Sequence, residues 1–431
     1  MTMMTTRRQF LLGSAAAITA GAISPAFAAD TKLRLLFWGG KARADRTFAA
    51  TDLFSKANPG VTIDGEFMAF QDYWAKLGTQ TAGGNAPDII QMDYRYIVEY
   101  AVRNGIAPLD EFIGGALQLG DFDKDQLDGG KVNGKLYGIS LGANSVALMV
   151  DEAAFKEAGV APPDRNTTYE DLPALAAQFN AANKRSGMKV FQDGSGVEPA
   201  LENWLRQRGK ALYTADGKPA FDAQDMTDWF QLWADLRAAE VIVSAEDQAI
   251  DATDAIENTM ITLGKAATTF ANSNQLIAFQ AVNKDPLTMT SFPRAKAGSG
   301  GGHYRKPSMF FSVGGTSANK ELSAQFINFF ISDPEAAKAL GVERGIPCKA
   351  STRDVIAPTL DAQSKIALEF VSNLGDLLGP LPPAPPAAAG EVSTLLRTKS
   401  QEVAFGQQSP KDAGPAFFEQ AAATLARAKK G

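Results

Sequence analysis

Strand-like apolar segments alternate with helix-like segments from residue 32 onward, and this order limits the possible fold more than any other feature. The clearest strands are expected at 32–38, 61–67 and 88–91, and the helices between and after them at 45–57, 72–82 and 94–104. Asn58, Pro59 and Gly60 predict the end of the first helix, because Gly and Pro interrupt a helical pattern. Strands joined by helices of this length form βα units, so the sequence predicts an α/β fold with a largely parallel sheet.

The rest of the chain continues the mixed pattern, and its 431 residues are enough for two domains. The Pro-rich stretch 379–386 predicts an extended connector. A last amphipathic helix is expected at 416–430, with Pro415 at its opening. The other expected elements are a hairpin at 132–140, strands at 145–150 and 309–313, and helices at 151–158, 169–183, 225–239, 251–258 and 319–331.

The N-terminus has the pattern of an export signal. Arg7 and Arg8 precede an apolar stretch at 11–23, which is shorter than the roughly 20 residues that a membrane-spanning helix needs. Ala26 and Ala28 form a small-x-small cleavage site. The sequence therefore predicts a twin-arginine signal peptide over 1–28, cleaved near Ala28, and a periplasmic mature protein.

Two counts exclude much chemistry. The chain has one histidine, His303, and one cysteine, Cys348. Zinc sites, iron–sulfur clusters and intrachain disulfides need more of these residues, so no metal, cofactor or disulfide is expected. A Ser-His-Asp triad could use only His303, and no Gly-x-Ser-x-Gly elbow precedes a predicted helix. The net charge of −6 argues against nucleic acid as a partner.

Four stretches occur in an order that resembles one protein family: 35–40, 79–91, 133–144, and 264–270 followed by 314–331. Together they resemble the extracellular solute-binding proteins of carbohydrate ABC importers, which include maltose-binding proteins. The resemblance covers nearly the whole mature chain.

This resemblance implies two discontinuous Rossmann-like lobes joined by crossing hinge segments, the type II periplasmic-binding-protein fold. The N-lobe would comprise 29–143 and 292–335, and the C-lobe 144–291 and 336–431. The crossings would lie near 142–146, 288–292 and 332–341. The implied function is that of a monomeric, non-enzymatic subunit. It would bind a mono- or oligosaccharide in the cleft by hinge closure and deliver it to a membrane permease.

A sugar presents apolar faces and a rim of hydroxyl groups, so its site needs aromatic rings together with carboxylate, amide or guanidinium groups. Loops after predicted strands offer such mixtures, and the loop with Asp93, Tyr94 and Arg95 is the strongest candidate. Trp38 could equally be a core residue and Arg43 a solvated helix residue, whereas a helix cap would explain Asp93 alone and not its neighbours. The cations at 41–43, near a helix start, suggest an anionic or highly hydroxylated ligand. The candidate ligand-binding residues are Trp38, Lys41, Arg43, Asp93, Tyr94, Arg95, Asn144, Glu198, Trp204, Asn272, Asn274, Arg305 and Arg344.

Two other functions stay open. A periplasmic carbohydrate-active enzyme, a lyase or a glycosidase, could use Asp93 and Glu198 as paired carboxylates. A signalling receptor subunit would share the fold and differ in its partner. The charge of the sugar also stays open, because the arrangement at 38–43 resembles members that bind oligosaccharides, uronic-acid oligomers among them, and arginine suits both carboxylates and neutral hydroxyls.

Overall fold

The computed structural model describes residues 31–251, 256–383, 385–386 and 388–428. The predicted signal peptide at 1–28 lies outside these residues, as does the middle of the helix expected at 251–258. Within the described part of the chain, no helix has both the length and the apolar character needed to cross a membrane.

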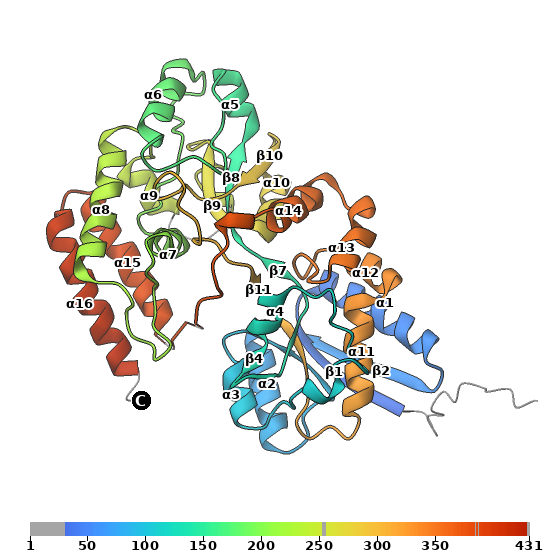
Figure 1. Ribbon diagram of the computed structural model, residues 1–431. Helices are drawn as coiled ribbons and strands as arrows, with labels where there is room; N and C mark the ends of the chain where they lie inside the picture. The colour runs from blue at the N-terminus through green and yellow to red at the C-terminus, as the bar shows by residue number, and fades with distance from the viewer. Residues whose placement is uncertain (1–30, 252–255, 384, 387, 429–431) are drawn as a thin grey trace, which may run out of the picture.

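Two lobes, each built on its own β-sheet, make up the molecule (Figure 1). The first sheet has the order β2-β1-β3-β12-β6; β1 is parallel to β2 and β3, and β12 is antiparallel to β3 and β6. The predicted strands in this sheet are confirmed. Its strands are β1 (Thr31–Trp38), β2 (Val61–Met68), β3 (Ile89–Met92), β12 (Phe310–Val313) and β6 (Ile139–Ser140), with the small hairpin β4 (Lys131–Val132) and β5 (Lys135–Leu136) nearby.

Helix α1 shows how the sequence forms the first lobe. It begins at Lys41, earlier than expected, because the extended backbone of Gly40 lets the chain turn directly from β1 into the helix. The backbone N–H and the side-chain amide of Asn58 both donate to the carbonyl of Phe54, so the helix ends where the sequence predicts. The helices of this lobe are α1 (Lys41–Ala57), α2 (Phe70–Ala82), α3 (Ile97–Val102), α4 (Lys124–Gly129), α11 (Lys320–Ser332), α12 (Pro334–Leu340) and α13 (Ala350–Ile356).

The second lobe has a three-stranded sheet in the order β10-β8-β9, and both outer strands run antiparallel to β8. The parallel pairing expected from the βα pattern is therefore confined, among the named strands, to β1, β2 and β3. All six residues of β8 are buried, because helices cover both of its faces. The strands are β8 (Val146–Asp151), β9 (Thr268–Asn272) and β10 (Leu287–Thr290).

Helices α8 and α16 pack along each other on the outside of the second lobe (Figure 1). The Phe417 ring stacks on Phe221 and meets Phe230 edge-on. Helix α16 begins at Pro410, so Pro415 lies inside it, not at its opening as predicted. The helices are α5 (Glu152–Ala158), α6 (Leu172–Ala182), α7 (Glu198–Gln207), α8 (Ala223–Ala238), α9 (Ala245–Asp251), α10 (Leu276–Val282), α14 (Ala362–Ser372), α15 (Ala389–Ala404) and α16 (Pro410–Ala428).

The chain passes between the lobes at three places, and two of them differ from the expected positions. The first passage runs from β7 (Ala143–Asn144) into β8. The second comes later than 288–292, because Phe292 still packs in the second core and the chain returns through β11 (Lys306–Pro307), which pairs with β7.

The third passage follows α13, not the segment 332–341. Helix α12 packs against α1, and α13 packs against α12 and α11, whereas α14 packs against α10 and β10. Helices α12 and α13 accordingly lie with the first lobe, although the resemblance placed 336–431 in the second lobe. Helical patterning alone did not show which sheet these short helices would cover.

Candidate functional site

A cleft of about 490 Å³ lies where residues of both lobes and of the connecting segments meet. The first lobe contributes the start of α2 and the loop after β3. The second lobe contributes one face of α7, the start of α15 and the end of β9. The proline-rich connector forms a further side. The volume is within the about 300–1,000 Å³ typical of small-molecule sites. The lining polar and aromatic side chains are Phe70, Asp93, Tyr94, Arg95, Glu198, Glu202, Tyr213, Asn272, Tyr304, Lys306 and Ser393.

The loop after β3 is positioned by that strand, which is buried along its whole length and ends at the cleft. Asp93 accepts a hydrogen bond from the backbone N–H of Arg95 at 2.8 Å, which fixes the turn that carries both side chains. The hydroxyl of Tyr94 donates to the carbonyl of Pro382 at 2.9 Å. Arg95 is exposed and lines the cleft.

Helix α7 presents Glu198 and Glu202, one turn apart, to the same cleft. The Tyr304 hydroxyl donates to Glu202 at 3.0 Å. The pKa of Glu198 is raised to about 7, chiefly by burial and next by the neighbouring Glu202, while a hydrogen bond from Ser393 acts in the opposite direction. Burial also raises the pKa of Glu202. The wall therefore holds two carboxyl groups that protonate more readily than in water.

Tyr213 stands next to these carboxyl groups. Its side chain is buried, and burial together with the two glutamates raises the pKa of its hydroxyl. That hydroxyl has no hydrogen-bond partner in the part of the chain that the structure describes. A buried hydroxyl without a partner is costly, and a bound polar molecule in the cleft could supply one.

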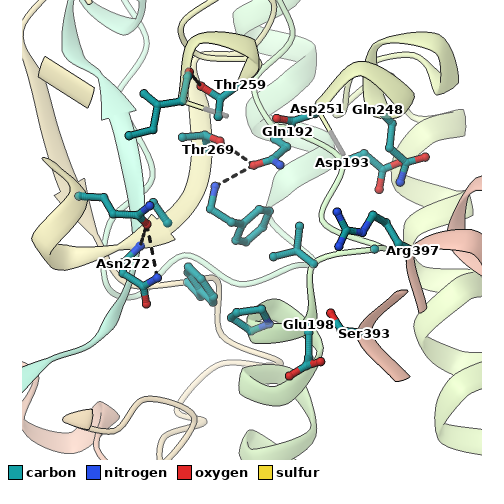
Figure 2. A pocket seen from close by; sticks show the side chains of 18 of the residues that line it. Gln192, Asp193, Glu198, Gln248, Asp251, Thr259, Thr269, Asn272, Ser393 and Arg397 are labelled. Atoms are coloured by element: carbon teal, nitrogen blue, oxygen red, sulfur yellow. Dashed lines mark hydrogen bonds between the residues drawn. The ribbon is translucent and has the colours of Figure 1, made fainter. Parts of the chain in front are cut away.

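A second pocket, of about 310 Å³, continues from the cleft into the second lobe (Figure 2). The two cavities share Glu198, Pro199, Asn272 and Ser393. The Gln192 side chain is fixed there, because its oxygen accepts hydrogen bonds from the Thr269 hydroxyl and the Phe270 N–H. In Figure 2, Glu198 lies at the edge of the pocket and its carboxyl group points away from Gln192. Glu198 thus stands where the pocket joins the cleft.

Five of the thirteen predicted ligand residues line the cleft: Asp93, Tyr94, Arg95, Glu198 and Asn272. Asn144 lies on β7 opposite Lys306, which is itself a cleft residue. Asn274 is exposed on the turn that follows Asn272 and lines neither cavity. Whether any of these side chains contacts a ligand stays a prediction.

The first predicted loop does not reach the cleft. Trp38 is buried among the rings of Phe70, Tyr73 and Trp74 and lines neither cavity. Lys41 pairs with Asp45 one turn later and is exposed. Arg43 forms an ion pair with Glu343, in which the Nε–H of Arg43 donates to both carboxylate oxygens at 2.9 and 3.0 Å. These partners balance both cations, so their place near the helix start does not indicate an anionic ligand.

Three further candidates have structural partners outside the cleft. Trp204 is buried against Trp229, and Arg208 lies over its ring at 4.3 Å. Arg305 forms ion pairs with Asp123 and Asp125, at 3.0 and 2.7 Å. Arg344 is 5% exposed and donates to Thr47, and burial together with the neighbouring Arg43 lowers its pKa to about 9.

The sequence prediction did not include Phe70, Glu202, Tyr213 or Lys306 as ligand residues. Glu202 carried a usable signal, because it follows Glu198 at the i, i+4 spacing that places two residues on one face of a helix. Tyr213 and Lys306 lie in segments without regular patterning, and only the tertiary fold brings them to α7. The described residues contain no group of three or more His, Cys, Asp or Glu that could hold a metal ion.

Known proteins share this architecture. An extracellular solute-binding protein family 1 member from Alicyclobacillus acidocaldarius is 29% identical, with a TM-score of 0.82 over 92% of this chain and 99% of that one. A periplasmic oligogalacturonide-binding protein from Yersinia enterocolitica is 22% identical, with a TM-score of 0.77 over 92% of this chain and all of that one. The second likeness shows the fold alone.

Sequence comparison gives the family. A binding protein of Brucella abortus is 30% identical over 129 residues, which is 30% of this chain and 30% of the length of that relative. The model of the bacterial extracellular solute-binding proteins matches residues 49–367, well over half of the chain. Together with the two lobes and the cleft between them, this match identifies the chain as a member of the bacterial extracellular solute-binding protein family.

Proposed function

We propose that this protein is the periplasmic solute-binding subunit of an ABC importer, and that it holds a mono- or oligosaccharide between its lobes and delivers it to the membrane permease. The observation that carries this proposal is the cleft, since it is lined from both lobes by aromatic rings, carboxyl groups and cations. These groups suit a molecule with apolar faces and a rim of hydroxyls. The oligogalacturonide-binding protein with the same fold supports a carbohydrate as the ligand class.

The proposed mechanism is closure of the lobes around the sugar. A ligand shifts an open–closed equilibrium only through contacts that it makes better in the closed state, so it must touch both lobes. Arg95 and Asp93 would supply the contacts of the first lobe, and Glu198 those of the second. The proposal needs no chemical step, and the protein would release its ligand unchanged. Export by the predicted twin-arginine signal and action as a monomer are parts of the same proposal.

A thermal-shift screen across neutral, acidic and phosphorylated sugars tests the function, because a ligand that binds the folded state raises its stability by mass action. Calorimetry on each hit then gives Kd. Small-angle scattering should show a smaller radius of gyration when the sugar is bound. Product analysis after long incubation should show the sugar intact, and its turnover would support the carbohydrate-active enzyme instead.

Two arginine variants locate the site. Arg95→Ala should weaken binding of the selected sugar at least five-fold, since it removes a cation from the cleft. Arg103→Ala is the matched control, because Arg103 is an exposed arginine of the same lobe that pairs with Glu99 and lines neither cavity. If both arginine variants bind the sugar equally well, and Asp93→Ala binds it as tightly as the wild type, the loop after β3 is not part of the site.

A further inference from the structure

The α7 wall of the cleft carries two acidic groups that no cation neutralises directly. Glu198 and Glu202 are one turn apart, and their bonded partners are hydroxyl groups, Ser393 for the first and Tyr304 for the second. Among the described residues, neither carboxyl group has a lysine or arginine within ion-pair distance. When both groups are ionised, which for Glu198 requires a pH above about 7, this side of the cleft is an acceptor surface that carries negative charge.

Three cations act on these glutamates through their electric field, Arg206 and Lys306 on Glu202 and Lys306 and Arg95 on Glu198. Arg206, on the same helix, donates to the carbonyl of Gly302 at 3.1 Å and to that of Pro380 at 2.6 Å. Arg95 and Lys306 lie exposed around the cleft, and their positive field already acts on Glu198, whose pKa it lowers against the larger effect of burial. A ligand carboxylate would compete with Glu198 for the field of these two cations.

The chemistry of the wall points to a ligand that donates hydrogen bonds. An ionised carboxylate only accepts hydrogen bonds, and a sugar hydroxyl can donate to it. The Tyr213 hydroxyl lacks a partner, and a sugar hydroxyl could serve it as donor or acceptor. A ligand carboxylate placed against α7 would instead bring a third acid to a partly buried site, where like charges repel more strongly than in water.

We infer that the sugar unit seated against α7 is uncharged, so that the protein selects neutral saccharides and rejects uronates at this end of the cleft. The inference rests on the proposed function and narrows it to one ligand class. It also separates this chain from the oligogalacturonide-binding protein with the same fold. The two glutamates act as specificity-determining residues because they disfavour the wrong ligand as well as accept hydrogen bonds from the right one.

Calorimetry on the mature chain with matched disaccharides tests the inference, at pH 8 so that Glu198 is ionised. The probes are neutral disaccharides of the galactose and glucose series and the corresponding uronates, which differ only in carrying a carboxylate instead of a hydroxymethyl group. The neutral member of a pair that binds should bind at least ten-fold more tightly than its uronate. The ratio should shrink at high salt, because salt screens the repulsion. A uronate that binds as tightly as its neutral partner, or more tightly, would overturn the inference.

Charge-removing variants connect the selectivity to α7. Glu202→Gln and Glu198→Gln should each reduce the neutral-to-uronate ratio at least three-fold, and thermal unfolding verifies that both are folded. Glu419→Gln is the matched control, because Glu419 is exposed on α16 and lines neither cavity. Unchanged ratios in both α7 variants would count against the inference alone. No response to any sugar in the thermal-shift screen would count against the proposed function, and the inference would fall with it.

Discussion

The hydroxyl of Tyr94 donates a hydrogen bond to the carbonyl oxygen of Pro382 across 2.9 Å, and this bond ties the first lobe to the proline-rich connector. Two residues earlier, the connector is held from the second lobe, since Arg206 donates to the carbonyl of Pro380. The connector therefore forms one side of the cleft, and a hydrogen bond from each lobe holds it in place. Because it is extended and rich in proline, it loses little conformational freedom when the two bonds form.

Tyr94→Phe removes the bond to the connector and keeps the aromatic ring. The expected loss of sugar-binding free energy is about 1 kcal/mol, the usual contribution of one hydrogen bond. This loss corresponds to a Kd roughly five-fold higher. Calorimetry with the sugar from the screen measures the change. Tyr137→Phe is the control, because Tyr137 is a partly buried tyrosine of the first lobe that lines neither cavity. Equal affinities for the two variants would show that the connector bond does not contribute to binding.

The carboxyl group of Glu198 makes the stability of the ligand-free protein depend on pH. Its pKa is about 7 in the folded protein, against 4.5 for an ordinary glutamate. Between these two values the folded protein holds a proton that the unfolded chain has lost, so the free energy of unfolding falls as the pH rises through this window. Above pH 7 Glu198 is ionised in the folded protein, and the full loss of unfolding free energy applies. This loss is on the order of 2 kcal/mol, since one pKa unit corresponds to about 1.4 kcal/mol and the group keeps some contact with water.

Glu198→Gln should remove this dependence, because the amide does not ionise. Urea unfolding at pH 5, 6, 7 and 8 measures it. The variant should be more stable than the wild type at pH 8, and this advantage should shrink towards pH 5. Parallel pH profiles for the two proteins would show that the carboxyl group titrates in the folded state as it does in water.

Replacing Trp204 should affect mainly stability, whereas replacing Phe70 should affect mainly sugar binding. Trp204 is packed against Trp229 in the second core, so Trp204→Ala should cost about 3–5 kcal/mol of unfolding free energy, as is usual for a large core residue. Phe70 is 36% exposed and lines the cleft, so Phe70→Ala should change stability much less and weaken sugar binding several-fold. Urea unfolding and calorimetry on both variants separate the two effects. A stable Trp204→Ala protein with weakened binding would restore Trp204 as a ligand residue.

The sequence predicted what local patterns determine. Strand β1 and helix α1 follow from apolar periodicity and the stop at Asn58. The loop with Asp93 and Arg95 is a candidate because charged and aromatic side chains gather after a buried strand and because the family resemblance implies ligand contacts there, and it lines the cleft. It did not predict features that depend on distant partners. Whether Trp38 is ligand or core depends on the rings of α2, which the chain supplies only after β2.

Arg305 is the clearest case in which a distant partner decides the role of a residue. The sequence shows an arginine in a loop after a glycine run, and this suits a ligand contact. The structure places it between Asp123 and Asp125, about 180 positions earlier in the chain, and Asp123 also accepts from Arg353 at 2.8 Å. The network thus anchors the second passage between the lobes, next to β11, to the first lobe.

Arg305→Gln should therefore act on stability more than on affinity. Its ion pairs are less than one-fifth exposed at the arginine, so their loss should lower the free energy of unfolding by about 1.5–3 kcal/mol, the range for hydrogen bonds to charged groups. Asp123 would still form its ion pair with Arg353, which limits the loss of unfolding free energy. Sugar affinity should stay within about two-fold of the wild type, while Arg95→Ala in the same assay loses affinity. A variant of full stability with much weaker binding would show that Arg305 contacts the ligand, as the sequence suggested.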